Sequence, residues 1–202
     1  MIVDERIITF INSLDTKNSE ILEDIEREAL ADNVPIIRRE MQSFLKVLLM
    51  VKKPMRVLEV GTAVGFSALL MSEYVPEECA ITTIENYEKR IPIARQNFVR
   101  AGKEKKITLL EGDAMDVLKT LEGPYDFIFM DAAKGQYIHY LPEILRLLAK
   151  GGILVSDNVM QDGDVIESRF AVERRDRTIH ARMREYLYEL KHNDALVTSI
   201  IL

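Results

Sequence analysis

Residues 56–70 read RVLEVGTAVGFSALL, a short apolar run that ends in a glycine-containing turn and continues with helical periodicity. The same order of a β-branched apolar run followed by a helical segment recurs along the rest of the chain. Strands that alternate with helices form βαβ units, so the sequence predicts an α/β fold with a central, mostly parallel sheet flanked by helices. The predicted strands read RVLEV, AITTIE, KITLLEG, YDFIFMDA and GGILVSDN.

Residues 1–51 precede the first strand and read as helices. Pro35 ends the second of these helices, and a third begins soon after it. No repeat, linker or change of composition divides the chain, so we predict a single domain over 1–202, with an N-terminal helical cap over 1–51 and a core over 55–202. An apolar stripe at helical period marks the first helix: Ile7, Ile8, Ile11 and Leu14.

Composition excludes several classes of protein. The 202 residues carry 27 basic and 33 acidic side chains, and the net charge of −6 argues against a polyanion-binding protein of the histone kind. The single cysteine, Cys79, excludes a disulfide framework and a cysteine-based zinc site. No apolar run approaches the roughly 18 to 20 residues that cross a bilayer, and the first ten residues lack the basic region of a signal peptide. We therefore expect a cytoplasmic protein without membrane contact.

The turn after the first predicted strand carries Gly61 and Gly65, at the strand end where a doubly wound fold binds its ligand. Ala63 stands where a dinucleotide site has the glycine that admits a pyrophosphate. The pattern therefore favours a nucleoside ligand without that group and disfavours a dehydrogenase. A tight turn with a purely structural glycine is the alternative.

The next two predicted strands also end in polar residues. Glu85 closes the second strand, where a carboxylate can accept both ribose hydroxyls of a nucleoside. Asp113 and Ala114 follow the third strand, at a position that suits contact with an adenine ring. The alternative for Asp113 is a helix N-cap without any ligand.

The strongest cluster lies at the ends of the fourth and fifth predicted strands. Asp131, Asp157 and Asn158 bring two carboxylates and an amide oxygen to one crevice. Three oxygen donors without His or Cys suit a hard cation, Mg²⁺ first, with Ca²⁺ or Mn²⁺ as substitutes. Lys134 would lie beside that cation, which favours a neutral amine and makes it a candidate general base. Caps or turn residues for the acids, and a solvated loop lysine, are the alternatives.

Five motifs follow one another along the chain: LEVGTAVGFSAL, TIE, EGDA, FMDAAKGQY and VSDN. As a set they resemble the cation-dependent, S-adenosylmethionine-dependent O-methyltransferases, the family that contains catechol O-methyltransferase and the plant caffeoyl-CoA enzymes. The resemblance covers nearly the whole chain. It implies a Rossmann-like class I methyltransferase fold with extra N-terminal helices.

The resemblance also implies roles for individual residues. Asp131, Asp157 and Asn158 would hold the divalent cation, and Lys134 would be the general base. Ser67 would meet the methionine end of S-adenosylmethionine and Glu85 its ribose. The full set implied for the methyl-donor site is Glu59, Gly61, Ser67, Glu85, Asp113, Ala114 and Asp131.

Within the family, the resemblance is greatest to the bacterial branch that methylates 5-hydroxyuridine in tRNA to 5-methoxyuridine. Residues 169–184 contain six arginines against two acids, a local charge of +4 that could hold phosphates. We therefore expect tRNA as the acceptor. The alternative is a small catechol-like or phenolic hydroxyl substrate, for which Tyr137, Tyr140 and Phe170 would be available to stack. The arginines expected to contact RNA are Arg174, Arg175, Arg177, Arg182 and Arg184.

Three further expectations concern the whole chain. A non-catalytic nucleotide-binding protein is a second alternative, which the intact set of Asp131, Lys134, Asp157 and Asn158 disfavours. Relatives close with an antiparallel strand, whereas this sequence stops at ALVTSIIL, so we expect that strand to be missing and the natural product to be longer. A homodimer should cover the excess apolar side chains of the N-terminal helices. These are Ile7, Ile8, Ile11, Phe44, Leu48 and Leu49.

Overall fold

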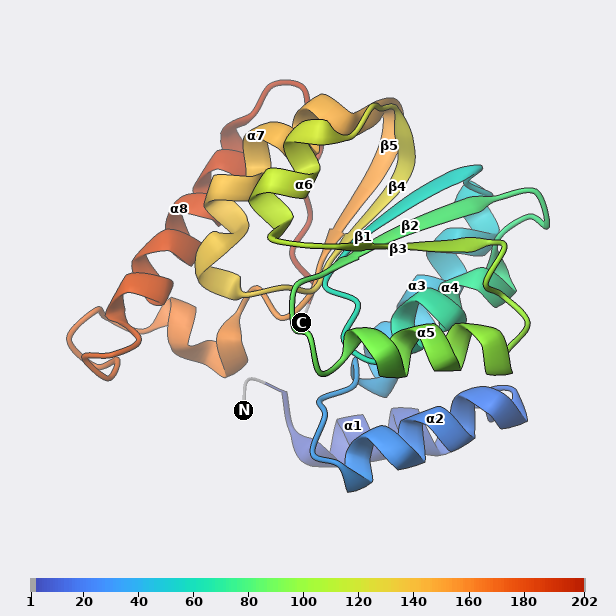
Figure 1. The fold of residues 1–202 in the computed structure, drawn as a ribbon. Helices are drawn as coiled ribbons and strands as arrows, with labels where there is room; N and C mark the ends of the chain where they lie inside the picture. Colours follow the sequence, from blue (N-terminus) through green and yellow to red (C-terminus); the bar gives the residue numbers. More distant parts are fainter. Residues whose placement is uncertain (1–2, 202) are drawn as a thin grey trace.

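The computed structural model describes residues 3–201 and contains one parallel sheet with helices on both faces (Figure 1). The strands are β1 (Arg56–Val60), β2 (Ala80–Glu85), β3 (Ile107–Glu111), β4 (Tyr125–Met130) and β5 (Leu148–Ser156). The helices are α1 (Glu5–Leu14), α2 (Glu20–Ala31), α3 (Arg39–Lys52), α4 (Phe66–Tyr74), α5 (Ile91–Arg100), α6 (Ala114–Thr120), α7 (Tyr137–Leu147) and α8 (Arg177–His192). Two short 3₁₀ segments are η1 (Lys134–Gln136) and η2 (Gln161–Ile166).

The strand order is β3-β2-β1-β4-β5, and every neighbouring pair is parallel. The order reverses between β1 and β4, where Val57 of β1 is in register with Phe127 of β4. In such sheets the loops at the carboxyl ends of the two central strands leave a crevice for ligands. The predicted α/β fold is confirmed, and the crevice falls at the loops that carry the predicted site.

The two faces of the sheet are covered by different helices (Figure 1). Val57 and Phe127 point into a core with α2 to α5. Leu58 and Ile128, the next residue along each strand, point into a second core with α6, α7 and α8. Because the central strands β1 and β4 are buried on both faces, they are mostly apolar, which made them readable in the sequence.

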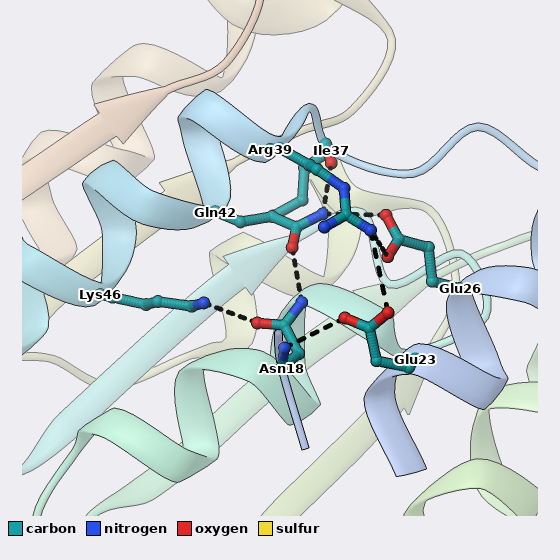
Figure 2. A network of polar contacts seen from close by, with 7 residues as sticks. All are labelled: Asn18, Glu23, Glu26, Ile37, Arg39, Gln42 and Lys46. Carbon is teal, nitrogen blue, oxygen red and sulfur yellow. Dashed lines mark hydrogen bonds and ion pairs between the residues drawn. The ribbon is translucent and has the colours of Figure 1, made fainter. Parts of the chain in front are cut away.

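The N-terminal helices are joined by a polar network around Gln42, whose side chain is 2% exposed (Figure 2). Its amide nitrogen donates to Glu26 Oε1 (3.2 Å) and to the carbonyl of Ile37 (3.0 Å). Its amide oxygen accepts from Asn18 Nδ2 (2.9 Å), and Lys46 Nζ donates to the other end of that asparagine (2.6 Å). Both ends of the Gln42 amide have partners, so this polar side chain can be buried between α2 and α3.

The C-terminal part of the described chain agrees with the expectation of a missing antiparallel strand, although β5 starts earlier than predicted. β5 begins at Leu148, three residues before the predicted Gly151, because α7 ends at Leu147 and the chain enters the sheet at once. Residues 196–201 form neither helix nor strand, and the sheet has no antiparallel strand within residues 3–201. No helix in this range is both long and apolar enough to cross a membrane.

Helix α1 leaves its apolar side chains exposed and contributes no buried residue. Ile7, Phe10, Ile11 and Leu14 are 52%, 64%, 45% and 67% exposed. Leu49, expected at the same surface, is instead fully buried because it faces the core under α3. The apolar surface that a second copy would cover is therefore centred on α1.

We predict a homodimer that α1 mediates, since association buries this apolar surface. Light scattering at micromolar concentration should give twice the 23.2 kDa of one chain. A variant with Phe10→Glu and Leu14→Glu should be monomeric, whereas Val99→Glu on α5, where the side chain is 63% exposed, should not change the mass. A single 23.2 kDa species for the parent protein would contradict the prediction.

Candidate active site

The loops after β1, β4 and β5 meet at the point where the strand order reverses. The Asp131 N–H donates to the carbonyl of Val60 (2.9 Å), and the Asp157 N–H donates to the carbonyl of Met130 (3.0 Å). Gly61 has a φ of +106°, and a Cβ there would lie 2.0 Å from the Asp131 carbonyl oxygen. Glycine is thus required at 61 so that the β1 and β4 loops can lie against each other.

Lys134 is held by two partners. Its Nζ donates to Asp131 Oδ1 (2.9 Å) and to the Tyr137 hydroxyl (3.0 Å). The Tyr137 hydroxyl in turn donates to the carbonyl of Met130 (2.8 Å). Burial, reinforced by the charge of Asp131, raises the pKa of Tyr137 well above its usual value, so this phenol keeps its proton. The side chain of Lys134 therefore has a fixed position beside Asp131.

Asp157 and Asn158 follow β5 next to this pair. Burial raises the pKa of Asp157, and the charge of Asp131 adds to the rise, while Lys134 and Arg38 oppose it. The two carboxylates therefore repel each other, which is the condition that a divalent cation relieves. Within residues 3–201 no group of three or more His, Cys, Asp or Glu could hold a metal, so the candidate ligands are two carboxylates and one amide. This oxygen-only set fits Mg²⁺.

Glu85 is ordered by backbone N–H groups at the end of β2. Its Oε2 accepts from Ala63 (2.7 Å), and its Oε1 accepts from Asn86 (3.0 Å) and Tyr87 (2.8 Å). Ala63 lies in the β1 turn with a φ of +46°. The carboxylate thus joins the turns after β1 and β2 and is fixed at the edge of the crevice.

Glu59 lies beneath the β1 turn and is fully buried. The Thr83 hydroxyl donates to its Oε2, whereas its Oε1 has no partner. Burial raises the pKa of Glu59 to about 7, the hydroxyls of Ser67 and Thr83 oppose the rise, and the charges of Asp131 and Glu85 add to it. The Glu59 carboxyl group is thus buried beneath the crevice, close to the hydroxyls of Ser67 and Thr83.

The other residues implied for the donor site lie at helix starts. Ser67 is in the first turn of α4, 8% exposed, just after the left-handed Gly65. Asp113 Oδ1 accepts from the Met115 N–H (2.9 Å) and caps α6, and Ala114 is the first residue of that helix. The capping role that the sequence offered as the alternative for Asp113 is therefore present.

A cavity of about 260 Å³ opens beside Lys134 and Asn158. Its remaining walls come from η2, from the segment after it and from the start of α8. The polar side chains on these walls are Gln161, Asp162, Asp164, Asp176 and His180. The cavity is thus placed to receive a molecule whose reacting group reaches Lys134.

A family model for O-methyltransferases matches residues 12–201. The chain belongs to the O-methyltransferase family. It is 35% identical to a catechol O-methyltransferase of Niastella koreensis over 61% of this chain and 58% of the relative. It is also 35% identical to caffeoyl-CoA O-methyltransferase 2 of Populus trichocarpa over 61% of this chain and 52% of the relative.

Solved structures of the O-methyltransferase family extend the likeness to the fold. An O-methyltransferase from Bacillus cereus in complex with SAH superposes with a TM-score of 0.82 at 25% identity, over 94% of this chain and 86% of the other. The chain spans somewhat more than half the length of the curated relatives it matches. The predicted class I methyltransferase fold is confirmed.

In this O-methyltransferase-family chain the predicted RNA-contacting arginines do not form one free patch. Arg175 pairs with Glu173 (3.0 Å), and within residues 3–201 the guanidinium of Arg174 makes no hydrogen bond or ion pair. The other three donate to backbone carbonyls: Arg177 to Val172 (3.3 Å), Arg182 to Gly135 (3.2 Å) and Arg184 to Val165 (2.9 Å). Their guanidinium groups hold the cavity wall together.

Tyr137 and Tyr140, which would have been available to stack on a small acceptor, are buried at 0% and 6% exposed and are not available for this. Both lie on the inner face of α7, and Tyr137 packs edge-on against Tyr186 of α8 with 5.4 Å between ring centroids. Phe170, at 85% exposed, remains available. The hydrogen bond between Tyr137 and Lys134 was not predicted, although their spacing of three residues could have indicated it.

Proposed function

We propose that this chain is an S-adenosylmethionine-dependent O-methyltransferase, with a divalent cation held by Asp131, Asp157 and Asn158 and with Lys134 as the general base. The observation that carries the proposal is the 2.9 Å contact between Lys134 Nζ and Asp131, beside a cavity that Lys134 and Asn158 line. Together, the contact and the cavity support a base next to the proposed cation ligands, with space for an acceptor beside them.

When bound, the cation would supply charge that favours the ionised acceptor hydroxyl, and the donor would supply an activated methyl group. As the proposed base, Lys134 would accept the hydroxyl proton at Nζ. The resulting ammonium is stabilised by Asp131 and by the oxygen of Tyr137, which lie 2.9 and 3.0 Å from Nζ. Because Tyr137 donates its own proton to the carbonyl of Met130, its oxygen is free to accept from Lys134. Positioning of this kind contributes a large part of catalysis.

Glu85, Glu59 and Ser67 would hold the methyl donor above Gly61. The Glu85 carboxylate, fixed by three N–H groups, would accept from the ribose hydroxyls. Glu59 and Ser67 would lie beneath the donor, where burial raises the pKa of Glu59 to about 7 and the Ser67 hydroxyl opposes the rise. Gly61 has no side chain, so a ligand in the crevice can approach its backbone closely.

Replacing Glu85 by Ala should weaken the binding of S-adenosylhomocysteine by roughly 1.5 to 3 kcal/mol, the contribution of hydrogen bonds to a charged group. Isothermal titration calorimetry measures this difference. Glu111→Ala is the matched control, because Glu111 ends the neighbouring strand β3 in register with Glu85. An equal dissociation constant for Glu85→Ala and the parent would remove Glu85 from the site.

The acceptor we propose first is a small catechol-like molecule with two adjacent oxygens. Two vicinal oxygens can share one cation, and a cavity of about 260 Å³ suits a single ring with a short substituent. The test is incubation with labelled donor, Mg²⁺ and a panel of catechols, with and without EDTA. Methylation that EDTA abolishes supports the proposal, and methylation that persists in EDTA overturns the role of the cation.

A second candidate acceptor is 5-hydroxyuridine in tRNA, which also presents two adjacent oxygens. The exposed side chains of Arg174 and Arg175 beside the cavity wall favour it, since they could reach phosphates of an RNA. The same labelled-donor assay on bulk tRNA that lacks the modification tests it directly.

If tRNA binds, an Arg174→Ala, Arg175→Ala variant should bind it more weakly, with the log–log salt slope reduced by about 0.7 to 0.9 for each phosphate that the variant no longer neutralises. Turnover of a catechol should be unchanged, because a catechol has no phosphate. Arg27→Ala, on the outer side of α2 and 71% exposed, is the control. Binding curves measured at several salt concentrations decide the question, and an unaltered slope would contradict the tRNA candidate.

A further inference from the structure

Residues 158–163, the left-handed segment, begin at the proposed cation ligand Asn158 and have an uncommon backbone. Asn158, Gln161 and Asp162 have φ values of +49°, +48° and +54°. They are three of the six non-glycine residues with positive φ that the structure describes. Side chains rarely adopt this conformation, and it persists where surrounding contacts hold it. The contacts that hold the segment therefore matter for the cation site.

The left-handed segment has few polar contacts with the rest of the chain. The backbone N–H groups of Gln161 and Gly163 donate to carbonyls inside the segment, at 3.2 and 2.9 Å. Within residues 3–201 a single ion pair reaches it from another element: Arg38 Nη2 donates to Asp162 Oδ1 at 2.6 Å. Arg38 is therefore the polar side chain outside the segment that fixes the position of Asp162.

Arg38 extends from a fixed position at the start of α3. Its carbonyl accepts from the Gln42 N–H (2.9 Å), and the Gln42 side chain donates to the carbonyl of Ile37 (3.0 Å). Arg39, the next residue, forms an ion pair with Glu26 of α2 at 3.3 Å (Figure 2). The polar network between α2 and α3 thus holds the backbone on both sides of Arg38.

The charge of Arg38 lies close to the proposed cation site. The ion pair with Asp162 raises the pKa of Arg38, partial burial opposes the rise, and the charge of Asp157 adds to it. The guanidinium thus keeps its charge and is near enough to Asp157 to interact with it. Asp162 lines the cavity, whereas Arg38 is outside the lining. Arg38 can therefore act on the site through Asp162.

We infer that Arg38 is a positioning residue: its ion pair with Asp162 fixes the left-handed segment in the conformation that presents Asn158 to the cation. The Gln161 N–H donates to the Asn158 carbonyl (3.2 Å), so the turn held at Asp162 starts at the cation ligand. The inference rests on the proposed function for the role of Asn158. It also gives the N-terminal helices a part in forming the site, because Arg38 lies at the start of α3.

Two variants that each break the ion pair test the inference: Arg38→Ala and Asp162→Asn. Asparagine tolerates a left-handed φ, so Asp162→Asn removes the charge and keeps the backbone preference. Hydrogen–deuterium exchange of residues 158–163 should be about two- to fivefold faster in both, the effect of losing an exposed ion pair. The double variant should exchange no faster than either single variant, because both remove one contact. Arg38→Lys keeps the charge and should exchange like the parent.

The affinity for Mg²⁺ alone, measured by calorimetry, separates positioning from a direct effect of charge. If Arg38 positions Asn158, both Arg38→Ala and Asp162→Asn should bind Mg²⁺ about two- to fivefold more weakly than the parent. A direct effect of charge has opposite signs in the two variants. Loss of the Arg38 cation would tighten the binding of Mg²⁺, and loss of the Asp162 anion would weaken it.

Arg100→Ala is the matched control, since Arg100 also forms an ion pair between two elements, with Glu28 of α2 at 2.7 Å. It should change neither the exchange of residues 158–163 nor the affinity for Mg²⁺. Parental exchange in Arg38→Ala, additive effects in the double variant, or opposite changes of Mg²⁺ affinity would overturn the inference. Weaker Mg²⁺ binding in both variants of a parent that methylates no acceptor would support the inference and overturn the proposed function instead. A parent that does not bind Mg²⁺ would overturn both.

Discussion

An Asp157→Ala variant is expected to transfer methyl groups at least about 100-fold more slowly than the parent, since a cation held by carboxylates contributes several kcal/mol to such a step. We expect the rate to fall because the variant no longer binds the cation. Mg²⁺ should raise the unfolding temperature of the parent, because a ligand that binds only the native state stabilises it, and should not raise that of the variant. Labelled-donor rates and thermal unfolding with and without Mg²⁺ measure both effects.

The fold should survive this substitution. Burial and the charge of Asp131 raise the pKa of Asp157, so its removal relieves an unfavourable carboxylate in the metal-free protein. The metal-free variant should therefore unfold at the same temperature as the parent or higher. Asp116→Ala on α6, where the side chain is 82% exposed, is the control and should keep the parent's rate. A parental rate in Asp157→Ala would remove Asp157 from the cation site.

Gly61→Ala should have the largest effect on stability, about 2 to 5 kcal/mol less free energy of unfolding. Two costs add: a φ of +106° that an L residue rarely adopts, and a Cβ that would lie 2.0 Å from the backbone oxygen of Asp131. The clash is with main chain, so no side-chain rotation relieves it. Urea unfolding measures the difference.

Gly102→Ala separates the two costs. Gly102 has a φ of +63°, and a Cβ there has no atom within 4 Å. Its substitution should therefore show only the conformational cost, about 1 to 2 kcal/mol. An equal loss of unfolding free energy in Gly61→Ala and Gly102→Ala would mean that the contact between the β1 and β4 loops does not restrict position 61 to glycine.

Much of the fold was predictable because its signals are local. The central strands β1 and β4 are buried on both faces, so their apolar runs stand out, and β1 matches the predicted run at both ends. The start of β5 was misplaced because Leu148, Ala149 and Lys150 continue the pattern of α7, and only the sheet pairing of Leu148 with Tyr125 moves the boundary. Pairing between distant segments is not visible in local periodicity.

The site was predictable where a residue ends a strand, and not where its role depends on contacts from elsewhere. Asp131 and Asp157 were found because parallel strands end at one edge. The burial of Tyr137 depends on Tyr186, which comes from α8. The count of arginines in 169–184 could not show that Arg182 and Arg184 donate to the backbone carbonyls of Gly135 and Val165.

The division of the cavity between two parts of the chain has a consequence for how acceptor preference can diversify. Apart from Lys134 and the proposed cation ligand Asn158, every described side chain that lines the cavity lies in the continuous segment 161–180. We expect that exchanging this segment between relatives would alter which molecule is accepted, while Asp131, Lys134 and Asn158 stay unchanged. The hydrogen bond from Arg182 to Gly135 limits how far such an exchange can extend toward the C-terminus. A chimaera whose downstream junction lies before Arg182 keeps this hydrogen bond, which joins α8 to the turn that carries Lys134.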